Sequence, residues 1–123
     1  MPPVSLRTAD GQRAFQPGQE VAGTAAWQLP EAPAKAEVCL FWFTEGKGTQ
    51  DVEVADRAAF DGLAASDERP FRLQLGDGPF SFSGKLISLR WAIELVTEEP
   101  HDTERLDIVV SPTGREVVLG EGP

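Results

Sequence analysis

The sequence predicts an all-β domain, a sandwich of two antiparallel sheets with about seven or eight strands. Two observations carry this prediction. In nearly every informative segment the apolar residues recur with a period of two rather than 3.6, as in strands that bury one face. Turn-forming residues interrupt these segments at intervals of about ten to fifteen residues, which is typical of antiparallel sandwiches.

Length and composition predict a single domain over residues 1–123. The chain has 41% hydrophobic and 25% charged side chains, as an ordinary globular protein does. Its net charge of −9 repels phosphate backbones, which argues against nucleic acid as a partner. No apolar stretch approaches the roughly 18 residues of a membrane-spanning helix, and the N-terminus lacks the layout of a secretion signal. Because Cys39 is the only cysteine and lies in an apolar run, we expect a buried structural thiol in a cytoplasmic protein without membrane insertion.

The first two clear strands are expected over residues 21–27 and 36–43. In the first strand alternate residues share one face, namely Val21, Gly23, Ala25 and Trp27. The small residues among them, Gly23 and Ala25, predict close approach by another sheet. The second strand, AEVCLFWF, is apolar on both faces, with Val38, Leu40 and Trp42 on one and Cys39, Phe41 and Phe43 on the other. Such a strand is central in its sheet or covered on both sides.

The segment TEGKGTQDVEVADR, residues 44–57, predicts a hairpin turn followed by a strand. Val52 and Val54 alternate with Asp51 and Glu53, so we expect the valines to face inward and the outer face of this strand to be acidic. The alternation then breaks down over residues 56–67. The alanine-rich part of that segment, RAAFDGLAAS, predicts a short helix there, although its glycine weakens it.

Period-two alternation returns in the second half of the chain. PFRLQL predicts a strand over residues 70–75 with Phe71, Leu73 and Leu75 inward. After the loop GDGPFSFSG comes the longest strand, whose core-facing residues are Ile87, Leu89, Trp91, Ile93 and Leu95. RLDIVV, with Leu106, Ile108 and Val110 on one face, and the short REVVL complete the predicted sheets.

No motif in the sequence predicts catalysis. EGKGT, residues 45–49, resembles a phosphate-binding loop, but the Walker spacing is absent and a strand follows it, so we interpret it as a hairpin turn. His101 lies among carboxylates in EEPHDTE, and no serine occupies a nucleophile elbow of the GxSxG kind. The carboxylates of this loop do not have the spacing of a calcium-binding EF-hand. We therefore expect no enzyme activity, no cofactor and no metal.

The tryptophans leave a second function open. Trp27, Trp42 and Trp91 all fall on apolar faces, which predicts core packing. Any of them that is exposed would instead serve as a platform for a sugar. A small-ligand or carbohydrate-binding sandwich is therefore the alternative function.

Two stretches resemble arrestin-like domains. FQPGQEVAGTAAW, residues 15–27, looks like their opening hairpin, and RPFRLQLGDGPFSFSGKLISLRWAIELV, residues 69–96, resembles their later strands and the proline-containing loop between them. The resemblance extends to the bacterial sporulation-control protein family, in which a GKGT hairpin would also be at home. It implies an immunoglobulin-like sandwich that acts as a scaffold or adaptor, without catalytic residues. Arrestins proper carry two such sandwiches, whereas this chain has room for one, so their phosphate sensing is not carried over.

We accordingly expect a protein-interaction module that binds through sheet edges and loops. Its partners are other proteins, and a homodimer would supply the second sandwich. Two loops are candidate contacts because their composition permits movement. Their residues are Gly46, Lys47, Gly48, Thr49 and Gln50 in the hairpin, and Pro79, Phe80 and Ser81 before the longest strand.

Overall fold

The computed structural model describes residues 3–46, 50–84, 87–113 and 117–118. Nearly all of its regular structure is β. The elements are β1 (Val4–Thr8), the 3-10 helix η1 (Ala9–Gly11), β2 (Ala14–Phe15), β3 (Glu20–Gln28), β4 (Lys35–Gly46), β5 (Val52–Ala59), β6 (Ser66–Gln74), β7 (Phe82–Ser83), β8 (Ile87–Glu98), β9 (Asp102–Val110) and β10 (Val117–Val118). Within these ranges no helix is long and apolar enough to cross a membrane.

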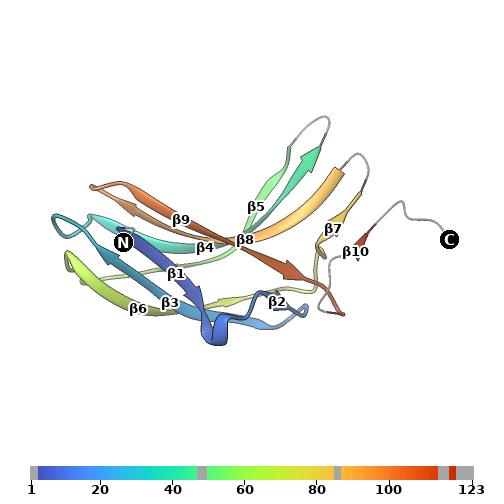
Figure 1. Ribbon diagram of the computed structural model, residues 1–123, viewed down its shortest axis with the longest axis horizontal. Coiled ribbons are helices and arrows are strands. Elements are labelled where there is room, and N and C mark those ends of the chain that lie inside the picture. Colours follow the sequence, from blue (N-terminus) through green and yellow to red (C-terminus); the bar gives the residue numbers. More distant parts are fainter. Residues whose placement is uncertain (1–2, 47–49, 85–86, 114–116, 119–123) are drawn as a thin grey trace.

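The strands form two sheets that pack face to face (Figure 1). The smaller sheet has the order β1-β3-β6, and the larger sheet has the order β10-β7-β8-β4-β5, with β9 paired to β8 and β2 paired to β9. The pairs are antiparallel except for two short parallel ones, β2 with β9 and β7 with β10. The predicted all-β sandwich is therefore confirmed. The prediction lacks three strands: β1, whose alternation covers only five residues, and β2 and β7, which are too short to show a periodicity.

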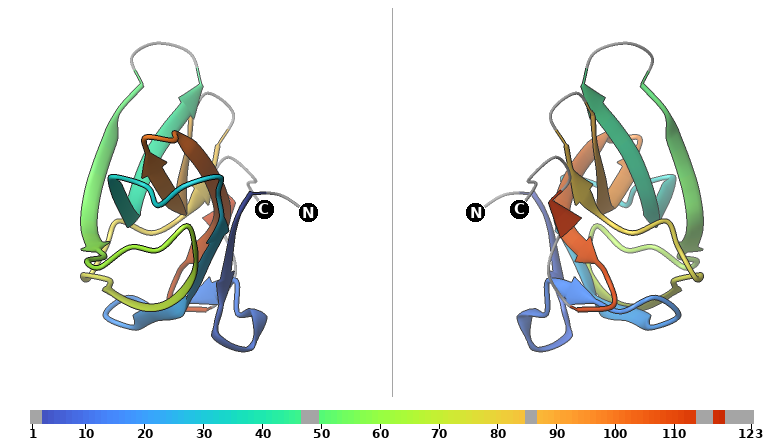
Figure 2. Two further views of the ribbon diagram at one scale, coloured as in Figure 1. Left: turned by 90° about the vertical axis from the view of Figure 1, so that its left-hand side faces the viewer. Right: turned by 90° about the vertical axis from the view of Figure 1, so that its right-hand side faces the viewer.

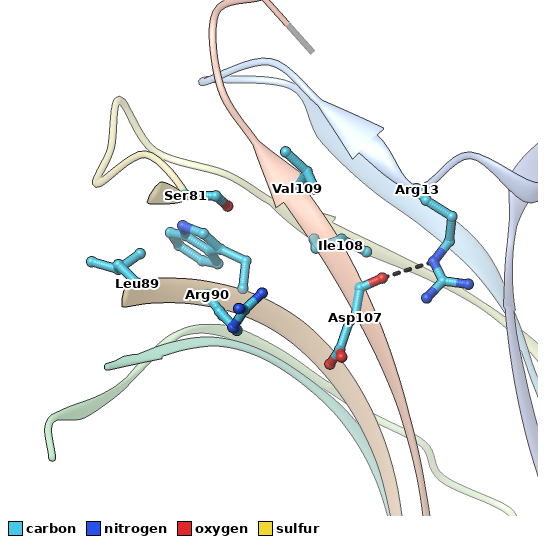
Figure 3. Close-up of a pocket in the computed structure, with 8 residues that line it drawn as sticks. Arg13, Ser81, Leu89, Arg90, Asp107, Ile108 and Val109 are labelled. Carbon is cyan, nitrogen blue, oxygen red and sulfur yellow. Dashed lines mark hydrogen bonds between the residues drawn. The ribbon is translucent and has the colours of Figure 1, made fainter. Parts of the chain in front are cut away.

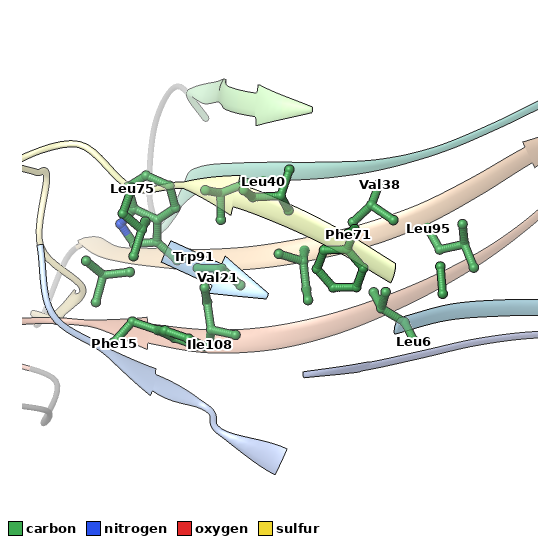
Figure 4. Close-up of a cluster of buried hydrophobic side chains, with 14 of the residues drawn as sticks. Leu6, Phe15, Val21, Val38, Leu40, Phe71, Leu75, Trp91, Leu95 and Ile108 are labelled. Atoms are coloured by element: carbon green, nitrogen blue, oxygen red, sulfur yellow. The ribbon is translucent and has the colours of Figure 1, made fainter. Parts of the chain in front are cut away.

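The core lies between the two inner faces and contains most of the residues that the alternation predicted (Figure 4). Ile87 is an exception: it is 40% exposed at the start of β8, so its predicted place in the core is wrong. Trp27 and Trp91 are both almost fully buried. The indole N–H of Trp27 donates to the backbone oxygen of Ala64, and that of Trp91 donates to the backbone oxygen of Pro79, each over 2.8 Å. Burial of these polar groups is therefore compensated, and each indole ties a loop to the core.

Gly23 is needed for a close approach, but the approach comes from within its own sheet. A Cβ at this position would meet the backbone oxygen of Arg7, and would lie 2.7 Å from Cζ of Phe71 and 2.9 Å from Cα of Thr8. Thr8 and Phe71 are its partners on the two neighbouring strands, β1 and β6. The expected approach by another sheet is therefore wrong as the reason for a glycine here.

The short helix predicted within residues 56–67 is wrong. β5 continues to Ala59 and β6 already begins at Ser66, so an irregular loop occupies the space between. Gly62 has a φ of 63°, which breaks a right-handed helix. Arg69 holds the loop by donating to the backbone oxygens of Asp61 and Gly62, at 2.8 and 2.7 Å.

The predicted orientation of β5 is also wrong. Val52 and Val54 are opposite Phe43 and Phe41 on β4, so the valines share the outer face of the larger sheet with these rings. Their alternation is kept, but the side that faces the core carries Glu53. Because β4 is apolar on both faces, its sequence does not show which face its neighbour's valines will join.

Candidate functional site

The exposed half of β5 is the most conspicuous surface feature of the described chain. Val52 is 66% exposed and Val54 is 43% exposed, which is unusual for β-branched side chains in a strand. In the described part of the chain, β5 is the last strand on its side of the larger sheet. The hairpin end of β4 and β5 rises away from the smaller sheet (Figure 2).

The hydrogen bonds at the start of β5 determine where its backbone groups point. Thr44 donates its N–H to the backbone oxygen of Asp51, and Asp51 donates its N–H to Oγ1 of Thr44, both over 2.9 Å. The backbone bond marks Thr44 and Asp51 as a bonded position, with the Thr44 hydroxyl accepting the second bond, and bonded positions alternate with non-bonded ones along an antiparallel ladder. Since Val52 and Val54 are the non-bonded positions, their N–H and C=O groups point away from β4, whereas those of Glu53 point toward it.

A β-bulge separates this exposed half from a closed half. The register with β4 shifts between Leu40 and Phe41, which leaves Ala55 as the extra residue of β5. Just beyond it, the carboxylate of Asp56 accepts the N–H of Arg57 at 2.8 Å and the N–H of Gln74 on β6 at 2.9 Å. Asp56 therefore covers the edge beyond the bulge, residues 56–59, which we call the closed half, and the segment 52–55 is left open. We call this segment the free edge.

A hollow lies beside the free edge on the outer face of the sheet. It measures about 410 Å³ and is lined by Phe41, Phe43, Thr44, Glu45, Gln50, Val52 and Arg105. The rings of Phe41 and Phe43 are 5.9 Å apart, and the guanidinium carbon of Arg105 lies 4.5 Å from the centre of the Phe43 ring. Asp107 accepts from Nε of Arg105 at 3.0 Å and so orients it over the ring. We call this the outer hollow; Val52 and the two rings form its apolar part, and its other lining residues are polar or charged.

A larger groove lies beside the free edge on the inner face. It measures about 500 Å³ and is lined by Trp42, Glu53, Ala55, Asp56, Gln74, Leu75, Gly76, Gly78, Pro79 and Trp91. Trp42 is half-buried and lies directly opposite Glu53 in the ladder. Because Asp56 is occupied by backbone N–H groups, the exposed carboxylate of Glu53 is the charge that this inner groove offers to a ligand.

A third cavity, of about 260 Å³, lies where β9 separates from β8 (Figure 3). Trp91 and Ile108 are the last residues that the two strands pair, and β9 then pairs with β2. Ser81 takes over the vacated side of β9: its N–H donates to the oxygen of Val110 at 2.7 Å, and its Oγ accepts the N–H of Val110 at 2.9 Å. Ser81 is only 2% exposed. Its predicted role as a partner contact is therefore wrong, because its side chain completes the ladder of β9.

Four of the other predicted contact residues are described by the structure. Gly46 is exposed at the end of β4, and Gln50 lines the outer hollow. Pro79 is exposed and lines the inner groove, and Phe80 is 40% exposed in the same loop. The remaining three, Lys47, Gly48 and Thr49, lie outside the described residues.

Sequence reasoning missed the free edge itself. The residues that form it or flank it are Phe41, Trp42, Phe43, Val52, Glu53, Val54 and Arg105. One sequence signal was available. VEV follows, after a hairpin turn, a strand with aromatic residues on both faces, so the valines had to lie beside the aromatic residues of one face. That signal indicates a patch without showing on which side of the sheet it lies.

The reactive side chains of the described chain are held apart from one another. His101 is exposed in the turn between β8 and β9, whereas Ser81 lies beyond the opposite end of their ladder. In the described ranges, no three His, Cys, Asp or Glu side chains meet as metal ligands would. Burial, reinforced by the charge of Glu37, raises the pKa of the Cys39 thiol, so at neutral pH it is a poor nucleophile.

The two-sheet arrangement is that of an arrestin-like β-sandwich. Among solved structures the chain is similar to Spo0M, a sporulation control protein from Bacillus subtilis, with a TM-score of 0.66 and 16% identity over 88% of this chain. The match covers 48% of Spo0M, so this chain spans about half of that protein's length. A β-glucosidase from Listeria innocua matches 93% of this chain and 16% of its own, at a TM-score of 0.45 and 16% identity, which is too low to support an argument. No family model and no curated protein matches the sequence.

Proposed function

We propose that this chain is a non-enzymatic protein-interaction module, a scaffold or adaptor in the cytoplasm, whose partners dock at the hairpin end of β4 and β5. The observation that carries this proposal is the exposure of Val52 and Val54, at 66% and 43%, on an edge strand. Soluble proteins usually protect such edges with charges, prolines or a covering segment, because unpaired backbone groups beside apolar side chains promote association. Here the closed half of the edge is covered through Asp56, whereas the free edge has two exposed valines on its outer face and a single charge, Glu53, on its inner face.

The lower edge of the smaller sheet illustrates the contrast. Pro70 lies within β6, opposite Thr24 of β3. A proline has no N–H to donate, so it is tolerated in a strand where that position faces away from the neighbouring strand. The outer side of β6 therefore lacks a donor at its middle, which makes it a poor template for a partner strand. This comparison favours β5 as the docking edge.

The chemistry of the described residues supports a binding role over catalysis. The hydroxyl of Ser81 accepts a backbone N–H, and His101 lies too far along the sheet to act as its base. The carbohydrate-binding alternative is not favoured: a sugar platform needs an exposed ring face, whereas Trp27 and Trp91 are buried and Trp42, which lines the inner groove, is half-buried. The likeness to a sporulation control protein is in keeping with a regulatory role.

Affinity capture tests the proposed function. The immobilised chain would be compared with a Val52→Ser, Val54→Ser double variant, using lysate of the source organism in moderate salt. An Ala59→Ser variant is the matched control, since it alters an exposed side chain on the closed half of the same strand. We expect a protein that the unaltered chain and the control retain and the double variant loses. Equal retention by all three would refute docking at this hairpin.

A further inference from the structure

We infer that the free edge binds an extended segment of another protein in which a lysine or arginine stands between two apolar residues. This inference rests on the proposed function and specifies the chemistry of its partner. The segment adds to the larger sheet as a further strand beside β5, and its alternate side chains enter the outer hollow and the inner groove. Each step of the recognition follows from the geometry of three consecutive residues, Val52, Glu53 and Val54.

The backbone supplies the first element of recognition. The N–H and C=O groups of Val52 and Val54 point away from β4, as the alternation from the Thr44–Asp51 pair requires. An added strand can form hydrogen-bonded pairs at both positions, which is the usual mode of strand addition at a sheet edge. The bulge at Ala55 and the carboxylate of Asp56 end the pairing on one side, so recognition is concentrated on a short segment.

The outer face supplies the second element. Residues directly opposite each other on neighbouring strands share a face, with Cβ atoms about 5 Å apart. The partner residues opposite Val52 and Val54 therefore lie on the outer face, where both valines are exposed and the outer hollow begins. Behind the valines are the rings of Phe41 and Phe43. An apolar side chain at each of the two partner positions covers this surface, whereas a charged one would be desolvated against it.

The inner face supplies the charge preference. The partner residue between the two apolar ones lies opposite Glu53 and so faces the inner groove. A lysine or arginine there has the exposed Glu53 carboxylate as its direct neighbour and the indole of Trp42 one strand further. Opposite charges across a strand pair attract, and tryptophan is the best aromatic partner for a cation. A glutamate at the same partner position would face Glu53 with like charge.

The same charge argument opposes a second copy of this chain at the free edge. Antiparallel pairing of two β5 strands about Glu53 would place the two Glu53 carboxylates opposite each other. Each copy also carries a net charge of −9, which adds long-range repulsion. Charge complementarity therefore assigns the edge to a cationic segment of a different protein, and self-association becomes a competing result of the test.

Two synthetic peptides test the inference with the full chain. One is Thr-Ser-Val-Lys-Val-Ser-Thr with blocked ends, and the other has glutamate in place of lysine. Fluorescence anisotropy of labelled peptide would give both affinities at low salt and at 0.15 M salt. We expect the lysine peptide to bind about tenfold more tightly at low salt, with a smaller difference at high salt because ions screen the pair. Equal affinities, or binding of neither peptide, would overturn the inference.

Two variants separate the charge from the backbone contribution. Glu53→Lys should reverse the preference, so that the glutamate peptide binds more tightly, while Glu31→Lys, the same charge change at an exposed residue in the β3–β4 loop, should leave the preference unchanged. Val54→Pro removes an outward N–H without touching the β4 ladder and should weaken both peptides. If Val54→Pro fails to fold, the reversal by Glu53→Lys still decides. A preference that Glu53→Lys leaves unchanged would overturn the inference.

The proposed function and this inference can fail separately. If the peptides do not discriminate but the Val52→Ser, Val54→Ser variant still loses its captured protein, the inference is wrong and docking at the hairpin stands. If sedimentation shows dimers of the unaltered chain that the same double variant abolishes, the edge belongs to a second copy and the inference is again wrong. Monomers that bind the lysine peptide support both.

Discussion

Replacing Trp91 tests whether the long alternation of β8 faces the core. This indole is 1% exposed, lies between Trp42 and Ile108 in the ladder, and donates to the backbone oxygen of Pro79 at 2.8 Å. Trp91→Ala removes a large buried side chain and should lower the free energy of unfolding by about 3–5 kcal/mol. Trp91→Phe keeps much of the ring but leaves the Pro79 oxygen without its donor, so about 1–3 kcal/mol is expected.

Urea unfolding followed by far-ultraviolet circular dichroism measures both losses without relying on tryptophan fluorescence. Trp42→Ala serves as the comparison, because Trp42 is only half-buried and its removal should cost less than that of Trp91. A domain of this size is stable by about 5–15 kcal/mol, so the Trp91→Ala loss is a large part of the total. A loss below about 1 kcal/mol for Trp91→Ala would refute the assigned strand face.

Three further predictions concern other parts of the fold. Gly23→Ala should cost about 1–3 kcal/mol or more in urea unfolding because a Cβ there has no room, whereas Gly76→Ala, where nothing lies within 4 Å, should be nearly neutral. Hydrogen bonds from Arg69 hold the pKa of Asp67 below its usual 3.8. The stabilisation from this pair is therefore complete above that pH and is lost as the pH falls through the lowered pKa. Asp67→Asn should flatten this acid dependence of the urea midpoint, and an unchanged dependence would contradict the assigned pairing. Because burial raises its thiol pKa, Cys39 should react with iodoacetamide more slowly than glutathione does at neutral pH; a faster rate would show an exposed thiolate.

The strands that bury one face could be predicted from the sequence alone. In β3, β6, β8 and β9 the apolar residues alternate because every second side chain enters the same core, as Phe71 and Leu73 do in β6. Segments of two residues such as β2 and β7 are too short to carry such a pattern, whether the partner is distant, as β9 is for β2, or follows closely, as β8 does for β7. Both lie where β9 separates from β8: beyond that point β9 pairs with β2 and β8 pairs with β7.

The candidate site was harder to predict because it depends on register. VEV in β5 alternates perfectly, but only the pairing with Phe41 and Phe43 puts the valines outside. Hairpin register depends on turn geometry and bulges, and neither is evident from the alternation. Ser81 shows the same limit: its loop looks accessible from its composition, yet the departure of β9 from β8 buries its hydroxyl.

Amide hydrogen exchange at the free edge tests the central claim most directly. In the unbound chain the N–H groups of Val52 and Val54 point away from β4, whereas that of Glu53 points toward it. Saturation with the lysine peptide should slow exchange at Val52 and Val54 and leave Glu53 nearly unchanged, as resolved by nuclear magnetic resonance. Unchanged rates at both valines under saturation, or slowing confined to residues 76–81, would contradict docking at this edge.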